Sequence, residues 1–293
     1  MRIAVTGRSG QVVSSLLERA GGDVSVVALG RPELDLTERG AVLSALGACG
    51  CDVIVSAAAY TGVDKAESDA EAAMRVNGEG AGHVAEAAAA CGVPLLHLST
   101  DYVFDGRLDR PYREDDPTAP TSVYGRSKLA GEQRIAAIWP NHAILRTAWV
   151  YSPFGANFVK TMLSLGETRT EVSVVDDQLG NPTSALDIAD ALIAIARRLL
   201  ADDDPALRGV FHMTGRGEAS WADVAQATFD AAARHGRPRL RVNRIATADY
   251  PTPARRPANS RLDNTRLSRV FGLSLPPWRP SLESCVDRLL SSN

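Results

Sequence analysis

The sequence has few cysteines and no excess of charge of either sign. Its four cysteines, Cys49, Cys51, Cys91 and Cys285, do not have the spacing of metal ligands. We therefore expect reduced, structural thiols and assign no metal. The net charge is −3 and no strongly basic block is present, so the sequence lacks the positive footprint of proteins that bind nucleic acid. Nucleic acid is not an expected partner.

Long apolar runs are also missing. The longest, such as 185–196, contain Asp or Arg and are too short to cross a bilayer. The amino terminus enters a short apolar run and a glycine turn without the pattern of a secretory signal. We therefore expect a soluble, cytoplasmic protein with no membrane partner. At 293 residues and 45% hydrophobic content, the chain can bury a large core, as one large or two modest domains.

A glycine turn near the amino terminus predicts a dinucleotide site. Residues 2–6 predict a strand, and Gly7 to Val13 open a helix that continues to Ala20. Gly7 allows the tight turn, and Gly10 lets backbone amides approach a pyrophosphate at the positive end of the helix. The predicted cofactor contacts of this turn are Gly7, Gly10, Gln11 and Val12. The fingerprint expects a third glycine where Val13 stands, so helix and strand must pack differently.

The end of the second predicted strand, 24–29, indicates which cofactor is preferred. Folds that bind NAD usually place an acid here to hold the ribose hydroxyls, but this chain has Gly30 and Arg31. An arginine suits a 2′-phosphate, so we predict NADPH, with NADH and a plain surface arginine as alternatives. Downstream, Asp35 or Thr37 is expected to cap a helix that runs to Leu46.

Two polar segments predict a site for carbonyl reduction. The stretch 123–138 lacks proline and predicts a helix that carries Tyr124 and Lys128 on one face. Because a nearby cation favours the phenolate, we expect Lys128 to lower the pKa of Tyr124 and suit it to acid–base work. Thr100 ends the apolar run 94–99, so its hydroxyl should emerge at the carboxyl edge of a parallel sheet. The two hydroxyls could then hold one carbonyl oxygen.

The pattern of elements predicts an α/β fold with a Rossmann-type doubly wound parallel sheet. A further strand over 143–151 would complete the nucleotide-binding domain, residues 1–150. The rest, 151–293, is expected to be mainly a smaller substrate domain that closes over the carboxyl edge of the sheet, with some segments returning to pack on the first. Helices are predicted over 157–165, 185–200 and 220–233, and strands over 172–175 and 209–213.

Two motifs carry a resemblance to a known family. Ser-Thr-Asp-Tyr-Val-Phe-Asp-Gly, from Ser99 to Gly106, and Tyr-Gly-Arg-Ser-Lys-Leu-Ala-Gly-Glu, from Tyr124 to Glu132, resemble the extended short-chain dehydrogenases/reductases. More narrowly, they resemble the dTDP-4-dehydrorhamnose reductases. This resemblance implies NADPH-dependent reduction of the 4-keto group of a dTDP-6-deoxyhexose, giving dTDP-L-rhamnose. In that reaction Tyr124 would donate a proton, Thr100 would orient the ketone, and Lys128 would hold the nicotinamide ribose.

The same resemblance implies further contacts with the cofactor and the nucleotide-sugar substrate. On the cofactor side it implies Asp35 and Leu36 beside the adenine, and Ala58, Ala59 and Tyr60 in a turn of small residues. Asn77 would be a structural asparagine. On the substrate side it implies Asp101, Trp149 stacked on a sugar or base face, and Arg255 engaging the diphosphate. Core packing for the tryptophan and surface charge for the arginine are the alternatives.

Other functions remain open from the sequence. A ketoreductase of another dTDP-deoxysugar would carry the same motifs, and an epimerase of the extended family would hold its cofactor tightly. The regulatory subunit of methionine adenosyltransferase also resembles these reductases and acts as a binding partner. The complete set of Thr100, Tyr124 and Lys128 favours catalysis. The assembly is also open, with a homodimer as one option.

Overall fold

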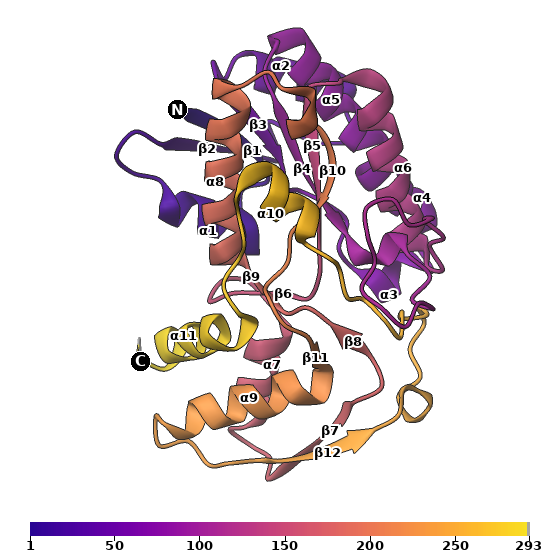
Figure 1. Cartoon of the computed structure of the whole chain (residues 1–293), viewed down its shortest axis with the longest axis vertical. Helices are drawn as coiled ribbons and strands as arrows, with labels where there is room; N and C mark the ends of the chain where they lie inside the picture. The colour runs from indigo at the N-terminus through magenta and orange to yellow at the C-terminus, as the bar shows by residue number, and fades with distance from the viewer. Residues whose placement is uncertain (292–293) are drawn as a thin grey trace.

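A six-stranded parallel sheet forms the centre of the computed structural model, which describes residues 1–291 (Figure 1). Every neighbouring pair in it is parallel. In the order β10-β5-β4-β3-β1-β2, the direction of winding reverses between β1 and β3, and such a reversal is where doubly wound sheets bind ligands. The strands are β1 (Arg2–Thr6), β2 (Ser25–Leu29), β3 (Val53–Ser56), β4 (Leu95–Thr100), β5 (His142–Thr147) and β10 (Gly209–His212).

Helices cover both faces of this sheet, so the predicted doubly wound fold is confirmed. One face holds α1 (Gln11–Arg19), α8 (Ala185–Ala201) and α10 (Thr265–Phe271), and the other holds α2 (Arg39–Gly47), α5 (Gly80–Cys91) and α6 (Val123–Ile138) (Figure 1). Alternate residues of β1 face the two layers: Ile3 and Val5 pack in the first core cluster, and Ala4 packs in the second. A strand buried on both faces has a nearly continuous apolar sequence, and β3 shows this pattern.

The strand predicted over 143–151 is interrupted. β5 ends at Thr147, and β6 (Val150–Tyr151) pairs instead with β9 (Thr183–Ser184). The chain changes direction at Trp149, whose φ of 50° is incompatible with a continuous strand. The sixth strand of the main sheet, β10, comes from residues after 150, and so does α8, whose Ile188 and Leu192 pack in the core with β1.

The remaining elements form a smaller layer beyond the carboxyl ends of the sheet strands (Figure 1). Two apolar clusters hold it together, one around Val224 and Leu282 and one around Phe229 and Val174. A capping box between Ser220 and Asp223 starts α9. The main elements are α7 (Phe158–Leu165), β7 (Glu171–Val175), β8 (Leu179–Gly180), β11 (Ala219–Ser220), α9 (Trp221–Ala233), β12 (Arg241–Ile245) and α11 (Trp278–Ser291).

Short helical turns complete the described part of the chain. They are α3 (Val63–Ala66), α4 (Ala70–Met74), the π-turn η1 (Arg75–Glu79), and the 3-10 turns η2 (Asp101–Val103), η3 (Pro205–Leu207) and η4 (Thr247–Asp249). Within residues 1–291, every helix is too short or too polar to cross a membrane.

Candidate active site

Helix α6 lies unusually close to the elements around it, and this places its side chains. Ser122 caps its first turn by accepting a hydrogen bond from Gly125 N at 3.1 Å. A Cβ at Gly125 would lie 2.2 Å from the carbonyl oxygen of Tyr102, and one at Gly131 would lie 2.2 Å from that of Asn77. Because both positions are glycine, the helix can approach η2 and η1 at backbone contact.

This approach brings Tyr124 beside the end of β4. Thr100 is buried, and its hydroxyl accepts from Tyr102 N at 3.2 Å and donates to Asp101 Oδ1 at 3.1 Å. The Thr100 side chain also lies close enough to Tyr124 to favour the ionised phenol. Thr100, Asp101 and Tyr124 therefore lie together in one polar group, with Ser260 beside Asp101.

The expected lowering of the Tyr124 pKa is wrong for this structure. The pKa of Tyr124 is raised to about 12, mainly by desolvation and also by the negative charge of Asp101, while the neighbouring Thr100 side chain opposes the shift. Lys128 does not act on the phenol here, because its Nζ donates to the carbonyl oxygen of Leu98 at 2.7 Å and lies 3.3 Å from His97 Nε2. Burial lowers the pKa of Lys128 to about 8, with Glu132 opposing. At neutral pH the phenol therefore keeps its proton.

A cavity of about 350 Å³ adjoins these residues, and we call it the central cavity. Two buried side-chain atoms of its lining, Asp101 Oδ2 and Thr147 Oγ1, have no partner among the described residues. Buried polar atoms are almost always paired in native proteins, so these two atoms suit a ligand rich in hydroxyl groups. The lining includes five predicted site residues, namely Gln11, Thr100, Asp101, Tyr124 and Trp149.

Trp149 forms part of this lining, but its ring faces are already covered. Its ring stacks on Trp221 with a centroid distance of 3.7 Å and an interplanar angle of 9°. A Cβ at Gly180 would lie 2.4 Å from Trp149 Cε2 and 2.7 and 2.8 Å from the two neighbouring ring atoms, so residue 180 sits above the ring. Stacking of Trp149 on a sugar or base face would require one of these neighbours to move.

The glycine turn fits a pyrophosphate. Gly7 and Gly10 have φ of 106° and 118°, a region that favours glycine, and a Cβ at Gly10 would meet nothing within 4 Å. No side chain caps the nine-residue helix α1, so its first amide groups are free to bind an anion. The third fingerprint glycine is replaced by Val13, which is buried with Cγ2 3.3 Å from the Cβ position of Gly7. Helix and strand are packed closely because residue 7, not residue 13, is small.

Hydrogen bonds connect the glycine turn and the start of α1 to neighbouring segments. Gln11 Nε2 donates to the carbonyl oxygen of Val150 at 3.2 Å, which ties the start of α1 to β6, and Val12 packs against the core. Thr6 Oγ1 accepts from the amides of Ala57 and Ala58 at 3.1 Å each, which folds the turn that also contains Ala59 over the end of β1.

Asn77 has the structural role that the resemblance implied. Its amide bridges the turn, with Oδ1 accepting from Tyr60 N at 2.8 Å and Nδ2 donating to Tyr60 O at 3.0 Å. Nδ2 also donates to Ser127 Oγ at 2.9 Å. The side chain is buried, so it fixes the 57–61 turn to α6.

Predicted cofactor residues also gather beyond the end of β2. Arg31 is exposed. The pKa of Asp35 is lowered mainly by the hydrogen bonds from Thr37 and, to a smaller extent, by the positive charge of Arg31. The expected helix cap is wrong: Glu38 precedes α2, and Asp35 instead accepts from Thr37 N and Oγ1 in a local turn. The backbone oxygen of Leu36 lies at hydrogen-bond distance from His83 Nδ1. Because Leu36 is only 7% exposed, its side chain offers little surface to an adenine.

Sequence reasoning missed Arg8. It follows Gly7, its Nε donates to the carbonyl oxygen of Gly30 at 3.4 Å, and it forms an ion pair with Glu33. Arg8 and Arg31 thus place two guanidinium groups around the end of β2. A basic residue inside the glycine turn was the available signal.

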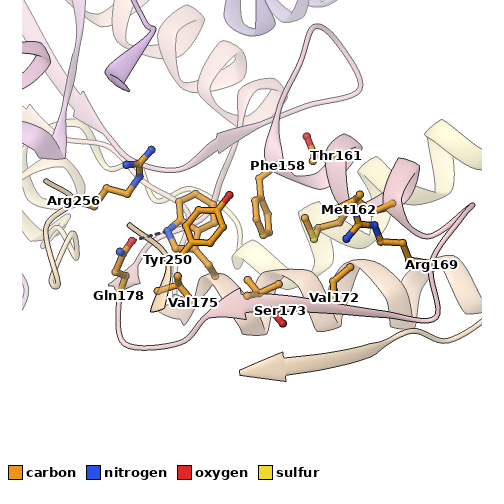
Figure 2. Close-up of a pocket in the computed structure, with 13 residues that line it drawn as sticks. Phe158, Thr161, Met162, Arg169, Val172, Ser173, Val175, Gln178, Tyr250 and Arg256 are labelled. Atoms are coloured by element: carbon orange, nitrogen blue, oxygen red, sulfur yellow. Dashed lines mark hydrogen bonds between the residues drawn. The ribbon is translucent and has the colours of Figure 1, made fainter. Parts of the chain in front are cut away.

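Two further cavities extend from the central one. The adjoining cavity, about 520 Å³, shares Phe158 and Trp221 with the central cavity, and Figure 2 shows Arg256 and Arg169 at opposite sides of it. An outer cavity of about 700 Å³ shares Tyr250 with it. Trp221 and Phe158 carry no sequence signal of a binding site, because aromatic residues at their positions are also consistent with ordinary helix packing.

Arg255, which the resemblance placed at the diphosphate, and its neighbour Arg256 lie in different surroundings. Arg255 is exposed and lines the outer cavity. Arg256 forms two hydrogen bonds with Asp64, at 3.0 and 2.7 Å, and lines both the adjoining and the outer cavities.

Comparison with known proteins identifies the family. The family described as "RmlD substrate binding domain" matches residues 1–291. The dTDP-4-dehydrorhamnose reductase of Sinorhizobium fredii is 53% identical over 290 residues, which cover 99% of this chain and 98% of that protein. The chain belongs to the dTDP-4-dehydrorhamnose reductase family.

Solved structures of the family agree with the fold. The dTDP-4-dehydrorhamnose reductase of Clostridium acetobutylicum superposes with a TM-score of 0.92 at 36% identity, covering 99% of each chain. That of Bacillus anthracis, solved in complex with NADP, gives a TM-score of 0.91 at 33% identity and covers 98% of this chain and 99% of its own.

Proposed function

We propose that this protein reduces the 4-keto group of dTDP-4-dehydro-L-rhamnose with NADPH, giving dTDP-L-rhamnose. The observation that carries the proposal is the grouping of Thr100, Asp101 and Tyr124 on the central cavity, in a chain that belongs to the reductase family. Residues that hold one carbonyl oxygen and supply one proton suit reduction of a ketone to an alcohol.

The protonation state of Tyr124 supports reduction. Bound NADPH would supply a hydride to the ketone carbon. The developing alkoxide then takes the phenolic proton of Tyr124, which burial keeps in place because it raises the phenol pKa to about 12. The Thr100 hydroxyl orients the ketone oxygen, and Lys128 would hold the nicotinamide ribose. The carbonyl carbon gains the hydride, its oxygen gains the proton, and an alcohol results.

The choice of NADPH rests on charge. Arg31 and Arg8 supply two cations near the end of β2, where a 2′-phosphate would lie. We propose Gly7, Gly10, Gln11 and Val12 for the pyrophosphate side, and Ala58, Ala59 and Tyr60 for contacts along the turn. Asp35 and Leu36 complete the proposed set near the adenine.

We place the sugar in the central cavity and the nucleoside diphosphate toward the adjoining and outer cavities. Asp101 Oδ2 and Thr147 Oγ1 are buried acceptor and donor atoms suited to sugar hydroxyls. The adjoining cavity has aromatic walls suited to a base, with Arg256 where it meets the outer cavity and Arg255 farther out. In this proposal the segments of 151–293 outside the main sheet act as the substrate domain. The four cysteines are free thiols, which fits the cytoplasm.

The test is to mix the protein with NADPH and dTDP-4-keto-6-deoxyglucose, with and without the 3,5-epimerase, and to follow the absorbance of the reduced nicotinamide. Oxidation that requires the epimerase is the expected result. Oxidation without it would indicate a ketoreductase of another deoxysugar, and no oxidation in either arm would contradict the proposal. The mass of the protein in solution, measured alongside, tests the homodimer option.

A further inference from the structure

A buried ion pair lies one helical turn beyond Lys128. The side chains of Glu132 on α6 and Arg146 on β5 are each 4% exposed. Arg146 binds the carboxylate twice, Nε to Oε1 at 3.0 Å and Nη2 to Oε2 at 2.7 Å. Ser99 Oγ of β4 donates to the same Oε1 at 2.5 Å. One carboxylate therefore joins α6, β4 and β5.

Two of these elements, β4 and α6, carry the proposed catalytic groups. Ser99 directly precedes Thr100 on β4, and Glu132 lies on the same helix as Tyr124 and Lys128. The relative position of the Thr100 hydroxyl and the Tyr124 phenol thus depends on how β4 is fixed to α6. The Ser99–Glu132 hydrogen bond is a direct side-chain link between them.

The charge of Glu132 also acts on Lys128. Burial lowers the pKa of Lys128, and Glu132 is the group that raises it. His97 on β4, which lies at hydrogen-bond distance from Lys128 Nζ, is held neutral because burial lowers its pKa well below 6.5. On the far side, Arg146 is bound by Glu132, and His212 on β10 is neutral at pH 7 because its pKa falls to about 3.

Stability alone does not explain such a pair. Two buried charges lose hydration that their attraction only partly restores, and well-packed apolar replacements of such pairs are often neutral or stabilising. Arg146 Nη1 is moreover buried without a partner among the described residues. An unfavourable arrangement of this kind, at the junction of the two elements that carry the catalytic groups, indicates a role in the site.

We propose, on the basis of the reductase function above, that Glu132 and Arg146 are positioning residues of this site. Through Ser99 they set the Thr100 hydroxyl against the Tyr124 phenol, and the carboxylate of Glu132 keeps Lys128 positively charged at neutral pH. Lys128 then presents its positive charge to the cofactor at neutral pH.

Two variants separate the two effects. Glu132→Gln removes the charge but keeps the size of the side chain, and Ser99→Ala removes the link to β4 but keeps the charge. The matched control is Asp116→Asn, because Asp116 also binds an arginine, Arg110, through two hydrogen bonds of 2.7 Å but lies at the surface. The measurements are kcat, KM, and the Kd of NADPH by fluorescence between pH 6 and 10.

In the wild type, NADPH affinity is expected to fall as pH rises past about 8, where Lys128 loses its proton. Glu132→Gln should move that midpoint down by about one unit, since a close opposite charge shifts a pKa by roughly one to three units. Ser99→Ala should lower kcat by roughly tenfold with KM and the midpoint unchanged. Asp116→Asn should match the wild type.

The inference is overturned if Glu132→Gln leaves the midpoint in place, or if Ser99→Ala leaves kcat unchanged. Should Glu132→Gln not fold, Ser99→Ala still decides the positioning part. NADPH binding needs no sugar, so an inactive wild type with a shifted Glu132→Gln midpoint would contradict the proposed substrate and leave the role of Glu132 standing.

Discussion

Gly131 of α6 packs directly against the backbone of Asn77, where a Cβ at residue 131 would lie 2.2 Å from the carbonyl oxygen. The Asn77 side chain in turn binds Tyr60 and Ser127. The helix that carries Tyr124 is therefore fixed to the turn proposed to contact the cofactor.

Gly131→Ala should consequently destabilise the protein by about 1–3 kcal/mol, because the backbone at Asn77 must move to admit a methyl group. Thermal unfolding measures the effect, and kcat should fall with it. Gly40→Ala is the control, since that helical glycine has nothing within 4 Å of its Cβ position and should gain up to about 1 kcal/mol in helix propensity. A Gly131→Ala protein as stable as the wild type would show that the close contact is not required.

Val13→Gly should restore the third fingerprint glycine without improving cofactor binding. Val13 already packs against the turn at Gly7, so its removal leaves a gap and adds a glycine to α1. We expect a loss of about 2–4 kcal/mol in stability and an unchanged Kd for NADPH. Tighter NADPH binding by the variant would mean that Val13 obstructs the cofactor.

The sequence predicted those parts of the fold that depend on local pattern. The helix over 123–138 and the strand over 2–6 were placed at their observed ends, because a run without proline and a short apolar run before Gly7 specify them locally. The break at Trp149 was not foreseen, since a positive φ at a tryptophan depends on Trp221 and Gly180, which are distant in sequence.

The site divides in the same way. The meeting of Thr100 and Tyr124 followed from strand-end and helix spacing, and the structure places them together. The direction of the shift in the Tyr124 pKa could not be predicted from the sequence. The spacing shows that Lys128 is near Tyr124, but it does not show that the ammonium group binds the carbonyl oxygen of Leu98. Desolvation, which raises the phenol pKa, depends on the whole fold around it.

Arg31→Ala should weaken NADPH binding by roughly tenfold and leave NADH binding unchanged, because a charge-assisted contact to a phosphate contributes about 1.5–3 kcal/mol. Equilibrium titration with each cofactor measures this. Arg237→Ala is the control, an exposed arginine in a loose pair with Glu167 at 3.8 Å. Equal losses for both cofactors would rule out contact with the 2′-phosphate.

Lys128→Met should change how stability depends on pH. The folded pKa of Lys128 is about 8, below the ordinary value near 10.4, so between these values the unfolded chain binds more protons and rising pH stabilises the wild type. Below about pH 8 the buried charge carries its full cost. The melting temperature of the wild type should therefore rise relative to Lys128→Met between pH 8 and 10. A constant difference over that range would contradict a buried, charged Lys128.

The most direct test of the account is the turnover of Tyr124→Phe, with Thr100→Val beside it, in the NADPH assay with the epimerase-derived ketosugar. We predict that each loses about 100-fold or more in kcat, since each removes one donor to the developing alkoxide, while the Kd of NADPH stays within about twofold. Near-normal turnover by Tyr124→Phe would contradict the assignment of Tyr124 as the proton donor, and with it the proposed site.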